Sequence, residues 1–304
     1  VPGSLAVNPG TLTLAYAGGA TLRVQDAAIA NGTWASTTLA LTNFNRSGQG
    51  TVLLQGLNGH LGFAQPYGDG EFITTGSLLG VSPAAAINNG ILPASILVTN
   101  PATGVAGFAT YGATGTTGFS AYTGSLSTSL SGLSVGSLAS VTTAQTLSDV
   151  NDVYAAITTS DISGGTLRIL SISNTNMGGL ILNGYGVAAP QITSDLLFGN
   201  LFLSQPAYGE GLVYVGAGVS SGTTTLSGTL TARNLTKFGN GTLRLSGNLA
   251  NLTGNIAVNS GTVSFGGNNA GPLAAQLSLN DLGTLDLAGA AVSVADLAGT
   301  PRAA

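Results

Sequence analysis

The chain has 304 residues, of which 6% are charged, 43% are hydrophobic and 47 are glycines. Ordinary domains carry about 25% charged residues, and exposed helix faces depend on them, so this composition excludes a mainly helical protein and favours an all-β one. A mean hydropathy of +0.39 excludes intrinsic disorder, and a net charge of −4 with a single lysine disfavours nucleic-acid binding.

The composition also bears on the compartment in which the protein works. The sequence contains no cysteine, which suits a protein outside a bacterial cell, and we expect an extracellular or cell-surface location. No apolar run reaches the roughly 18 residues of a spanning helix, so we expect no membrane-spanning segment. Because no apolar leader precedes Val1, we expect any secretion signal to have been removed or to lie outside this sequence.

In chain order, residues 1–99 are predicted to form β strands at irregular intervals. Residues 100–163 form a loop-rich section, for which a protruding loop and irregular strands are both compatible with the composition. Within it, Thr143–Asp161 carries a helical signal, because Ser148 or Asp149 can cap a helix. Four apolar residues follow at helical spacing and predict one short helix: Val150, Val153, Tyr154 and Ile157.

Residues 164–304 have the most regular pattern. A phrase of the form G-T-x-x-L-x-G, with Phe once in place of Leu, begins at Gly222, Gly241, Gly261 and Gly283. A regular period of about 20 residues is typical of a solenoid, in which each turn of the chain buries its apolar face against the next turn.

Alternation within this phrase assigns side chains to the two faces of a strand, because successive side chains point to opposite sides. The sequence predicts a dry core column and an outer column on the neighbouring positions. The core column is Leu226, Leu245, Phe265 and Leu287, and the outer column is Thr225, Arg244, Ser264 and Asp286.

Glycines mark the corners of the predicted turns. Gly247, Gly254 and Gly261 follow one another at a constant spacing with apolar pairs between them, which predicts three short strands per turn. At Asn240-Gly241 and Asn259 to Gly261 we expect the positive φ that sharp turns require. The predicted corner glycines are Gly241, Gly247, Gly254, Gly261 and Gly283.

The fold class that follows is all-β: a single right-handed parallel β-helix, or three-sided solenoid, over residues 1–304. At about 20 residues per turn and about 4.8 Å per strand, its length would be about 70 Å.

The segment Leu235–Phe265, LTKFGNGTLRLSGNLANLTGNIAVNSGTVSF, resembles the autotransporter-associated β-strand repeat. Gly283–Gly299 is similar to the strand pair that commonly follows this repeat. The resemblance implies a parallel β-helix, export, and either display on the cell surface or release, and it implies no shared catalytic residue. Autotransporters end in a membrane β-barrel, whereas this sequence ends at Ala304 without one, so we expect the barrel to lie outside the sequence or to be absent from the protein.

The beginning of the chain is similar to a later segment. Ser4–Leu14, SLAVNPGTLTL, resembles Asn255–Phe265, NIAVNSGTVSF. The chain is therefore interpreted either as a module of a longer tandem array or as a subunit with complementary ends. Unpaired strand edges at the two ends of a stack would allow head-to-tail self-association.

Few residues are candidates for chemistry. His60 is the only histidine, and without cysteine or a second histidine it is interpreted as an ordinary surface residue. The acidic pairs Asp69/Glu71 and Asp149/Asp152 have no basic neighbour in the sequence, which disfavours a polysaccharide lyase or hydrolase. Calcium binding by Asp149, Asn151 and Asp152 is an alternative to helix capping. We expect no catalytic residue, no cofactor and no metal site.

The predicted function is a non-catalytic structural or adhesive module. The alternative is a glycan-binding or glycan-degrading β-helix, for which aromatic side chains could form a sugar-stacking strip if they shared one face. The scattered arrangement is the simpler interpretation of these aromatic residues, which are Trp34 and the tyrosines Tyr16, Tyr67, Tyr111, Tyr122, Tyr154, Tyr185, Tyr208 and Tyr214.

Overall fold

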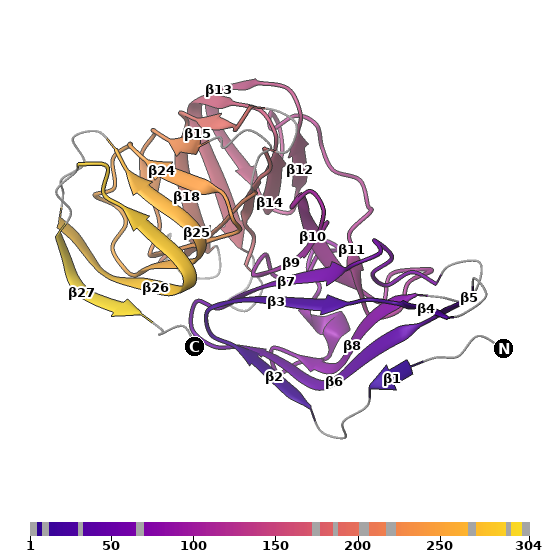
Figure 1. Cartoon of the computed structure of the whole chain (residues 1–304). Coiled ribbons are helices and arrows are strands. Elements are labelled where there is room, and N and C mark those ends of the chain that lie inside the picture. Colours follow the sequence, from indigo (N-terminus) through magenta and orange to yellow (C-terminus); the bar gives the residue numbers. More distant parts are fainter. Residues whose placement is uncertain are drawn as a thin grey trace. The chain divides into compact units, whose positions relative to one another are not determined.

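The computed structural model of the chain is nearly all β (Figure 1). This confirms the predicted all-β class. One short 3₁₀ turn, η1 (Pro83–Ala86), is the only helical element among the described residues. The structure describes residues 5–7, 12–29, 33–64, 70–171, 177–184, 188–200, 207–216, 223–266, 272–289 and 293–299.

The chain divides into two compact units, residues 1–124 and 125–304. Each unit has its own hydrophobic core. Phe44, Leu54 and Ile73 are fully buried in the core of the first unit, and Leu167, Leu243 and Val263 in that of the second.

The described part of the first unit contains two larger sheets in which most strands are parallel, and the antiparallel pair β4-β5. In one sheet, β6 pairs with β8 on one side and with the short strands β1 and β2 on the other. The other sheet has the order β11-β10-β9-β7-β3, with antiparallel pairing only around β10. The strands are β1 (Leu5–Val7), β2 (Thr13–Tyr16), β3 (Gly19–Val24), β4 (Ala27–Ile29), β5 (Thr33–Ala35), β6 (Thr37–Arg46), β7 (Thr51–Gly56), β8 (Glu71–Leu78), β9 (Ile96–Thr99), β10 (Ala106–Tyr111) and β11 (Phe119–Ala121).

Parallel partners in the first unit lie far apart in the sequence. Gly19 pairs with Thr51, and Thr37 pairs with Glu71, so each pair is separated by more than one turn of the predicted solenoid. Parallel strands need a long connection, and here each connection includes a strand of another sheet: β6 lies between β3 and β7, and β7 lies between β6 and β8. The short repeat of the second half is therefore not visible in this part of the sequence.

The second unit contains one large, predominantly parallel sheet that curls back on itself (Figure 1). Its strand pairs form three series, which recur in the same order along the chain. The first series runs through β12 (Leu138–Val141), β14 (Ala155–Thr158), β16 (Leu180–Leu182), β20 (Glu210–Val215), β23 (Asn234–Phe238), β25 (Ile256–Phe265), β26 (Pro272–Asp286) and β27 (Ser293–Gly299).

The second and third series share several long strands with the first. The second series links β13 (Gln145–Val153), β15 (Ile162–Ser171), β17 (Gln191–Ile192), β21 (Thr223–Leu226), β24 (Thr242–Leu245) and the later parts of β25 and β26. The third series links the later parts of β13 and β15 with β18 (Asp195–Asn200) and β22 (Leu230–Thr231), and β19 (Ala207–Tyr208) adds to β18 antiparallel.

Three members of the predicted core column lie in direct register. Leu226 pairs with Leu245, and Leu245 pairs with Phe265, and all three are at most 3% exposed. Leu287 departs from the prediction because it is 42% exposed and follows the end of β26. The pairing of β26 with β27 covers only Pro272–Leu279, so no described strand packs beyond Leu287.

The predicted outer column is also in register. Thr225, Arg244, Ser264 and Asp286 are paired in succession, and Arg244 and Asp286 are exposed. Ser264 is buried, and its hydroxyl donates to Asp286 Oδ2 at 3.2 Å. Exposed charge is therefore found where the alternation predicted it.

The predicted helix within Thr143–Asp161 is wrong, because this segment forms β13 and β14. β13 pairs with β15 in parallel, with an irregularity between Leu147 and Val150, and its backbone groups find their partners there. Val150 is 47% exposed whereas Val153 is buried, so their apparent helical spacing reflects a bulged strand. Tertiary pairing outweighs the helical signal of a short segment.

Close packing, more than a positive φ, accounts for glycine at the five predicted corner positions. Only Gly261 among them has a positive φ, +67°, and in the Asn240-Gly241 turn the positive φ belongs to Gly239 instead. An added Cβ at any of the five would come within 3.0 Å of a backbone carbonyl oxygen of a neighbouring segment. A side chain there would push adjacent strands apart, which is why these corners require glycine.

Candidate functional site

The first unit has a pocket of about 290 Å³ at the ends of β7, β9 and β10. Its walls are mostly apolar, with Leu61, Phe63 and Val98 on one part and Val105 and Ala106 on another. A pocket of this size and lining suits a small ligand with a large apolar face. The remaining lining residues are Gly56, Gly59, Thr99, Asn100, Pro101, Gly107 and Ala121.

A chain of polar side chains reaches this pocket across the sheet. Arg23 Nε donates to Gln55 Oε1 at 2.6 Å, and Gln55 Nε2 donates to Thr99 Oγ1 at 2.8 Å. Because the Thr99 hydroxyl accepts from Gln55, its own proton is directed elsewhere. Thr99 is 2% exposed and lines the pocket, so this chain of hydrogen bonds ends at the pocket wall.

The loop that forms one wall of the pocket is held by a buried carboxylate. Glu71 is fully buried at the start of β8, and its two oxygens accept the backbone N–H groups of Asn58 and His60 at 2.9 and 3.0 Å. Gly56 allows this approach, since an added Cβ would collide with the Glu71 carboxylate. Glu71 therefore shapes the pocket wall, whereas its predicted partner Asp69 lies outside the described residues.

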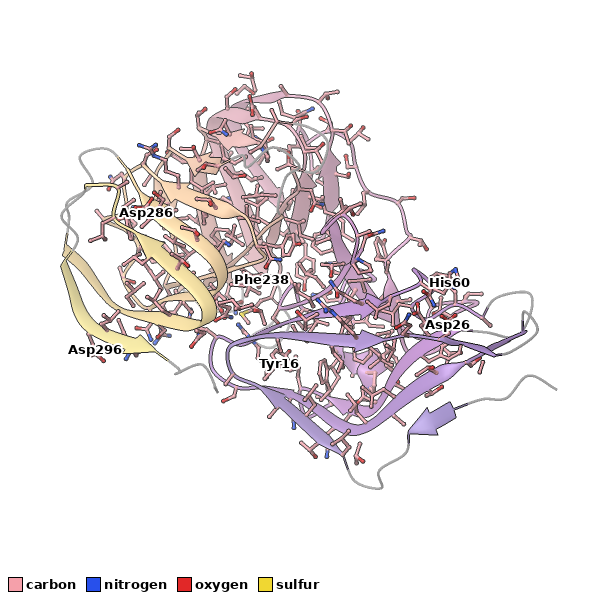
Figure 2. The ribbon with its side chains drawn as sticks, viewed as in Figure 1. Tyr16, Asp26, His60, Phe238, Asp286 and Asp296 are labelled. Carbon is pink, nitrogen blue, oxygen red and sulfur yellow. The ribbon has the colours of Figure 1, made fainter. Side chains whose placement is uncertain are left out.

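His60 and Asp26 lie next to each other in the first unit (Figure 2). His60 Nδ1 is 3.8 Å from Asp26 Oδ2, and neither atom has a hydrogen-bond partner among the described residues. The other Asp26 oxygen accepts from Asn58 Nδ2. The His60 side chain is 35% exposed, so it is half-buried beside the Asp26 carboxylate.

These sites were compared with known proteins. No protein-family model, curated protein or solved structure matches the chain. The described residues bring together no cluster of three histidine, cysteine or acidic side chains that could hold a metal ion. Within the same residues, no helix is long and apolar enough to span a membrane. The function is therefore inferred from the chemistry of the described side chains.

The second unit contains a buried amine. Lys237, the only lysine of the chain, is fully buried near the end of β23. Its Nζ donates to the carbonyl oxygens of Gly239, Gly241 and Ser260 at 2.5, 2.5 and 2.7 Å. Burial lowers the pKa of Lys237 to about 7. The amine connects the turn after β23 to the next strand in the series, β25, so its role here is to hold neighbouring strands together.

The acidic pair Asp149/Asp152 is occupied by contacts within the protein. Both oxygens of Asp152 accept from Arg168, at 2.6 and 2.7 Å, across the β13–β15 pair. These hydrogen bonds raise the pKa of Arg168. Asp149 Oδ1 accepts from the backbone N–H of Val150, and the Asn151 amide donates to the Asp149 carbonyl. Asp152 thus has a basic partner that the sequence separation had concealed.

The described tyrosines differ in burial. Tyr16 and Tyr154 are at most 3% exposed, and Tyr214 is buried edge-on against Phe238 with ring centroids 5.4 Å apart. Burial raises the pKa of Tyr214 to about 12. Tyr208, in contrast, is 39% exposed. The side chain of Trp34 and residues Tyr67 and Tyr185 lie outside the described part.

Sequence reasoning missed two groups of residues. Asp26 and Thr99 gave no signal, because the strands and loops that bring them to their partners Asn58 and Gln55 are distant in the sequence. Lys237 did carry a signal: a lone lysine in an apolar strand just before G-x-G, where backbone carbonyls turn inward.

Proposed function

We propose that this chain is a non-catalytic structural and adhesive module of a bacterial surface protein, built as a right-handed, three-sided parallel β-helix. The single observation that carries the proposal is the buried register of Leu226, Leu245 and Phe265, which recur once in each copy of the repeated phrase. A stack of this kind holds side chains at fixed positions along its length, so its function is to present a surface.

The order of the strand pairs supports the three-sided form. The three series recur in the same sequence, for example β14, then the two parts of β15, then β16. Connections between parallel strands of one sheet are right-handed in about 98% of cases, which supports the right-handed form. The resemblance of Leu235–Phe265 to the autotransporter repeat supports export to the cell surface.

A display experiment tests this proposal. Wild type and two variants are each anchored on a bacterium that lacks adhesins. Phe265→Asp places a charge in the core column, and Val150→Asp changes an exposed residue as the control. We expect wild-type and Val150→Asp cells to carry a protease-resistant chain and to adhere to host surfaces, and Phe265→Asp cells to lose both properties. Adhesion equal to that of the anchor alone, or depolymerisation of a polysaccharide by the purified chain, would contradict the proposal.

A second candidate function is glycan binding, which the pocket of the first unit favours. Phe63 offers a ring for a sugar face and Thr99 a hydroxyl proton for a sugar oxygen. Both residues lie in one pocket of about 290 Å³, large enough for a single sugar ring.

A glycan array separates the two candidates. Gly107 lines the pocket, and an added Cβ would meet nothing within 4 Å, so Gly107→Phe fills the pocket without strain. Ala144→Phe, at an exposed position of the second unit, is the control for the added ring. Glycan binding predicts a signal that Gly107→Phe abolishes and Ala144→Phe retains, whereas equal signals from the three proteins would rule out this pocket.

A further inference from the structure

The last described strands of the second unit expose residues whose counterparts in the preceding strands are buried. Leu235, Ile256 and Leu277 are successive register partners and are at most 1% exposed. Their next partner, Leu297 of β27, is 63% exposed. In the core column, exposure likewise rises from 0% at Phe265 to 42% at Leu287.

The rise in exposure has a geometric cause. Within a parallel stack each apolar side chain is covered by the equivalent side chain of the next strand, and Leu297 has no such neighbour among the described residues. Leu282 of β26 is also exposed, at 57%. Exposed apolar side chains on the last strands of a stack favour coverage by another strand.

The backbone of β27 points to the same conclusion. In the described part of the chain β27 pairs only with β26, so no described strand occupies its other edge. Such an edge takes up an extended segment as an additional strand. In this unit the pairing between β26 and β27 is parallel, and a further strand that continues the series is parallel too.

The first unit supplies a strand with the matching pattern. β1 is Leu5-Ala6-Val7, which aligns with Ile256-Ala257-Val258 of β25 and with Leu297-Ala298-Gly299 of β27. The similarity extends from Ser4 to Leu14. β1 pairs in parallel with Thr37–Leu39 of β6 and with no second strand among the described residues, so one of its edges is open.

We propose that β27 of one copy binds β1 of a second copy as the next parallel strand, with Leu5 stacked on Leu297. This inference rests on the proposed function, because it names the partner of a surface module. The contact joins two different surfaces and leaves one of each kind free, so it repeats head to tail. We infer that the repeat stays open, because successive strands of a solenoid continue along one axis. Asp296, labelled in Figure 2, is the neighbour of Leu297 on β27 and is exposed.

A disulfide trap tests the contact directly, because the chain has no cysteine of its own. Leu5→Cys and Leu297→Cys are purified separately, mixed and oxidised. Neighbouring strands lie about 4.8 Å apart, a distance that a disulfide can span. We expect a cross-linked dimer in this mixture, in a yield at least about tenfold above that of Leu5→Cys mixed with Val150→Cys, where the second cysteine lies on a remote exposed strand.

Sedimentation of the cysteine-free chain completes the test. Wild type and Val150→Asp are expected to form larger species as the concentration rises, whereas Leu297→Asp remains monomeric, with filaments visible by electron microscopy only for the first two. Equal cross-linking in both mixtures, or a wild type that is monomeric at every concentration, overturns the inference. If the wild type is a monomer that still resists protease and adheres, only the filament inference fails. If filaments form but cells do not adhere, only the proposed function fails.

Discussion

At the scale of single residues, Lys237 is the least expected feature. A fully buried amine with no described carboxylate next to it is costly, since burial disfavours the charged form. Here the three carbonyl oxygens of Gly239, Gly241 and Ser260 provide an acceptor for each proton of the ammonium group. On folding, hydrogen bonds from the ammonium group to water are therefore replaced by hydrogen bonds to three backbone carbonyl oxygens.

The depressed pKa of Lys237 predicts how stability depends on pH. The unfolded chain keeps the proton up to about pH 10.5, whereas the folded chain releases it near pH 7. Between these values the unfolded state binds more protons, so raising the pH stabilises the fold, by up to about 1.4 kcal/mol per pH unit. Urea unfolding at pH 7, 8 and 9 should show this rise in wild type and not in Lys237→Met, and identical slopes would disprove the assignment.

Close packing at a glycine predicts a second effect at this scale. A Cβ at Gly247 would meet the Gly228 carbonyl oxygen at less than 3.0 Å, whereas a Cβ at Gly107 would meet open space. We expect Gly247→Ala to destabilise the second unit by about 2 kcal/mol or more, since the strands have to separate. Gly107→Ala should change the free energy of unfolding by less than about 0.5 kcal/mol. Thermal unfolding followed by circular dichroism measures both, and equal melting temperatures would contradict the argument.

At the scale of strands, the core column predicts a gradient in the cost of truncation. Phe265 is fully buried between Leu245 and the last strands, so Phe265→Ala removes a large side chain from a packed stack and should cost about 3–5 kcal/mol. Leu287→Ala, in the same column but 42% exposed, should cost less than about 1 kcal/mol in a dilute solution of single copies. Denaturant titrations at micromolar concentration give both values. Similar losses for the two variants would mean that Leu287 is covered in solution.

The elements of the second unit were predictable where one strand repeats the pattern of the strand before it. The G-T-x-x-L-x-G phrase located β21, β24 and the later parts of β25 and β26, because period-2 alternation and a regular interval act together there. The helix predicted at Thr143–Asp161 failed because a bulge at Leu147–Val150 shifts the alternation and imitates a helical period. Local pattern cannot reveal a register that only the partner strand β15 determines.

The sites were less predictable than the strands. The sequence predicts Glu71 as one of an acidic pair and His60 as an ordinary surface residue, whereas their contacts come from loops and strands that the sheets of the first unit bring together. The pocket depends on Gly107 and Ala121 as much as on Phe63, and small residues carry no chemical signal in a sequence so rich in glycine. Long-range pairing creates these sites, so no single segment encodes them.

At the scale of the whole molecule, the two units have separate cores, and this predicts local effects of mutations. Leu54→Ala removes side-chain packing from the core of residues 1–124, and Leu243→Ala does so in the core of residues 125–304. Hydrogen exchange followed by mass spectrometry should show faster exchange only in the unit that carries the substitution. Faster exchange throughout the chain after either change would show that the two cores unfold as one.

The unequal intervals between parallel partners have a consequence for how such a protein diversifies. Leu180 and Val213 are separated by a much longer stretch of chain than Thr225 and Arg244, yet both pairs are neighbours in the same sheet. Closing a longer connection costs little extra free energy, because loop entropy grows only with the logarithm of length. Connections between strands can therefore lengthen without altering the strand pairing. Mutation and selection can change the exposed loops of such a protein while its β-sheet stays the same.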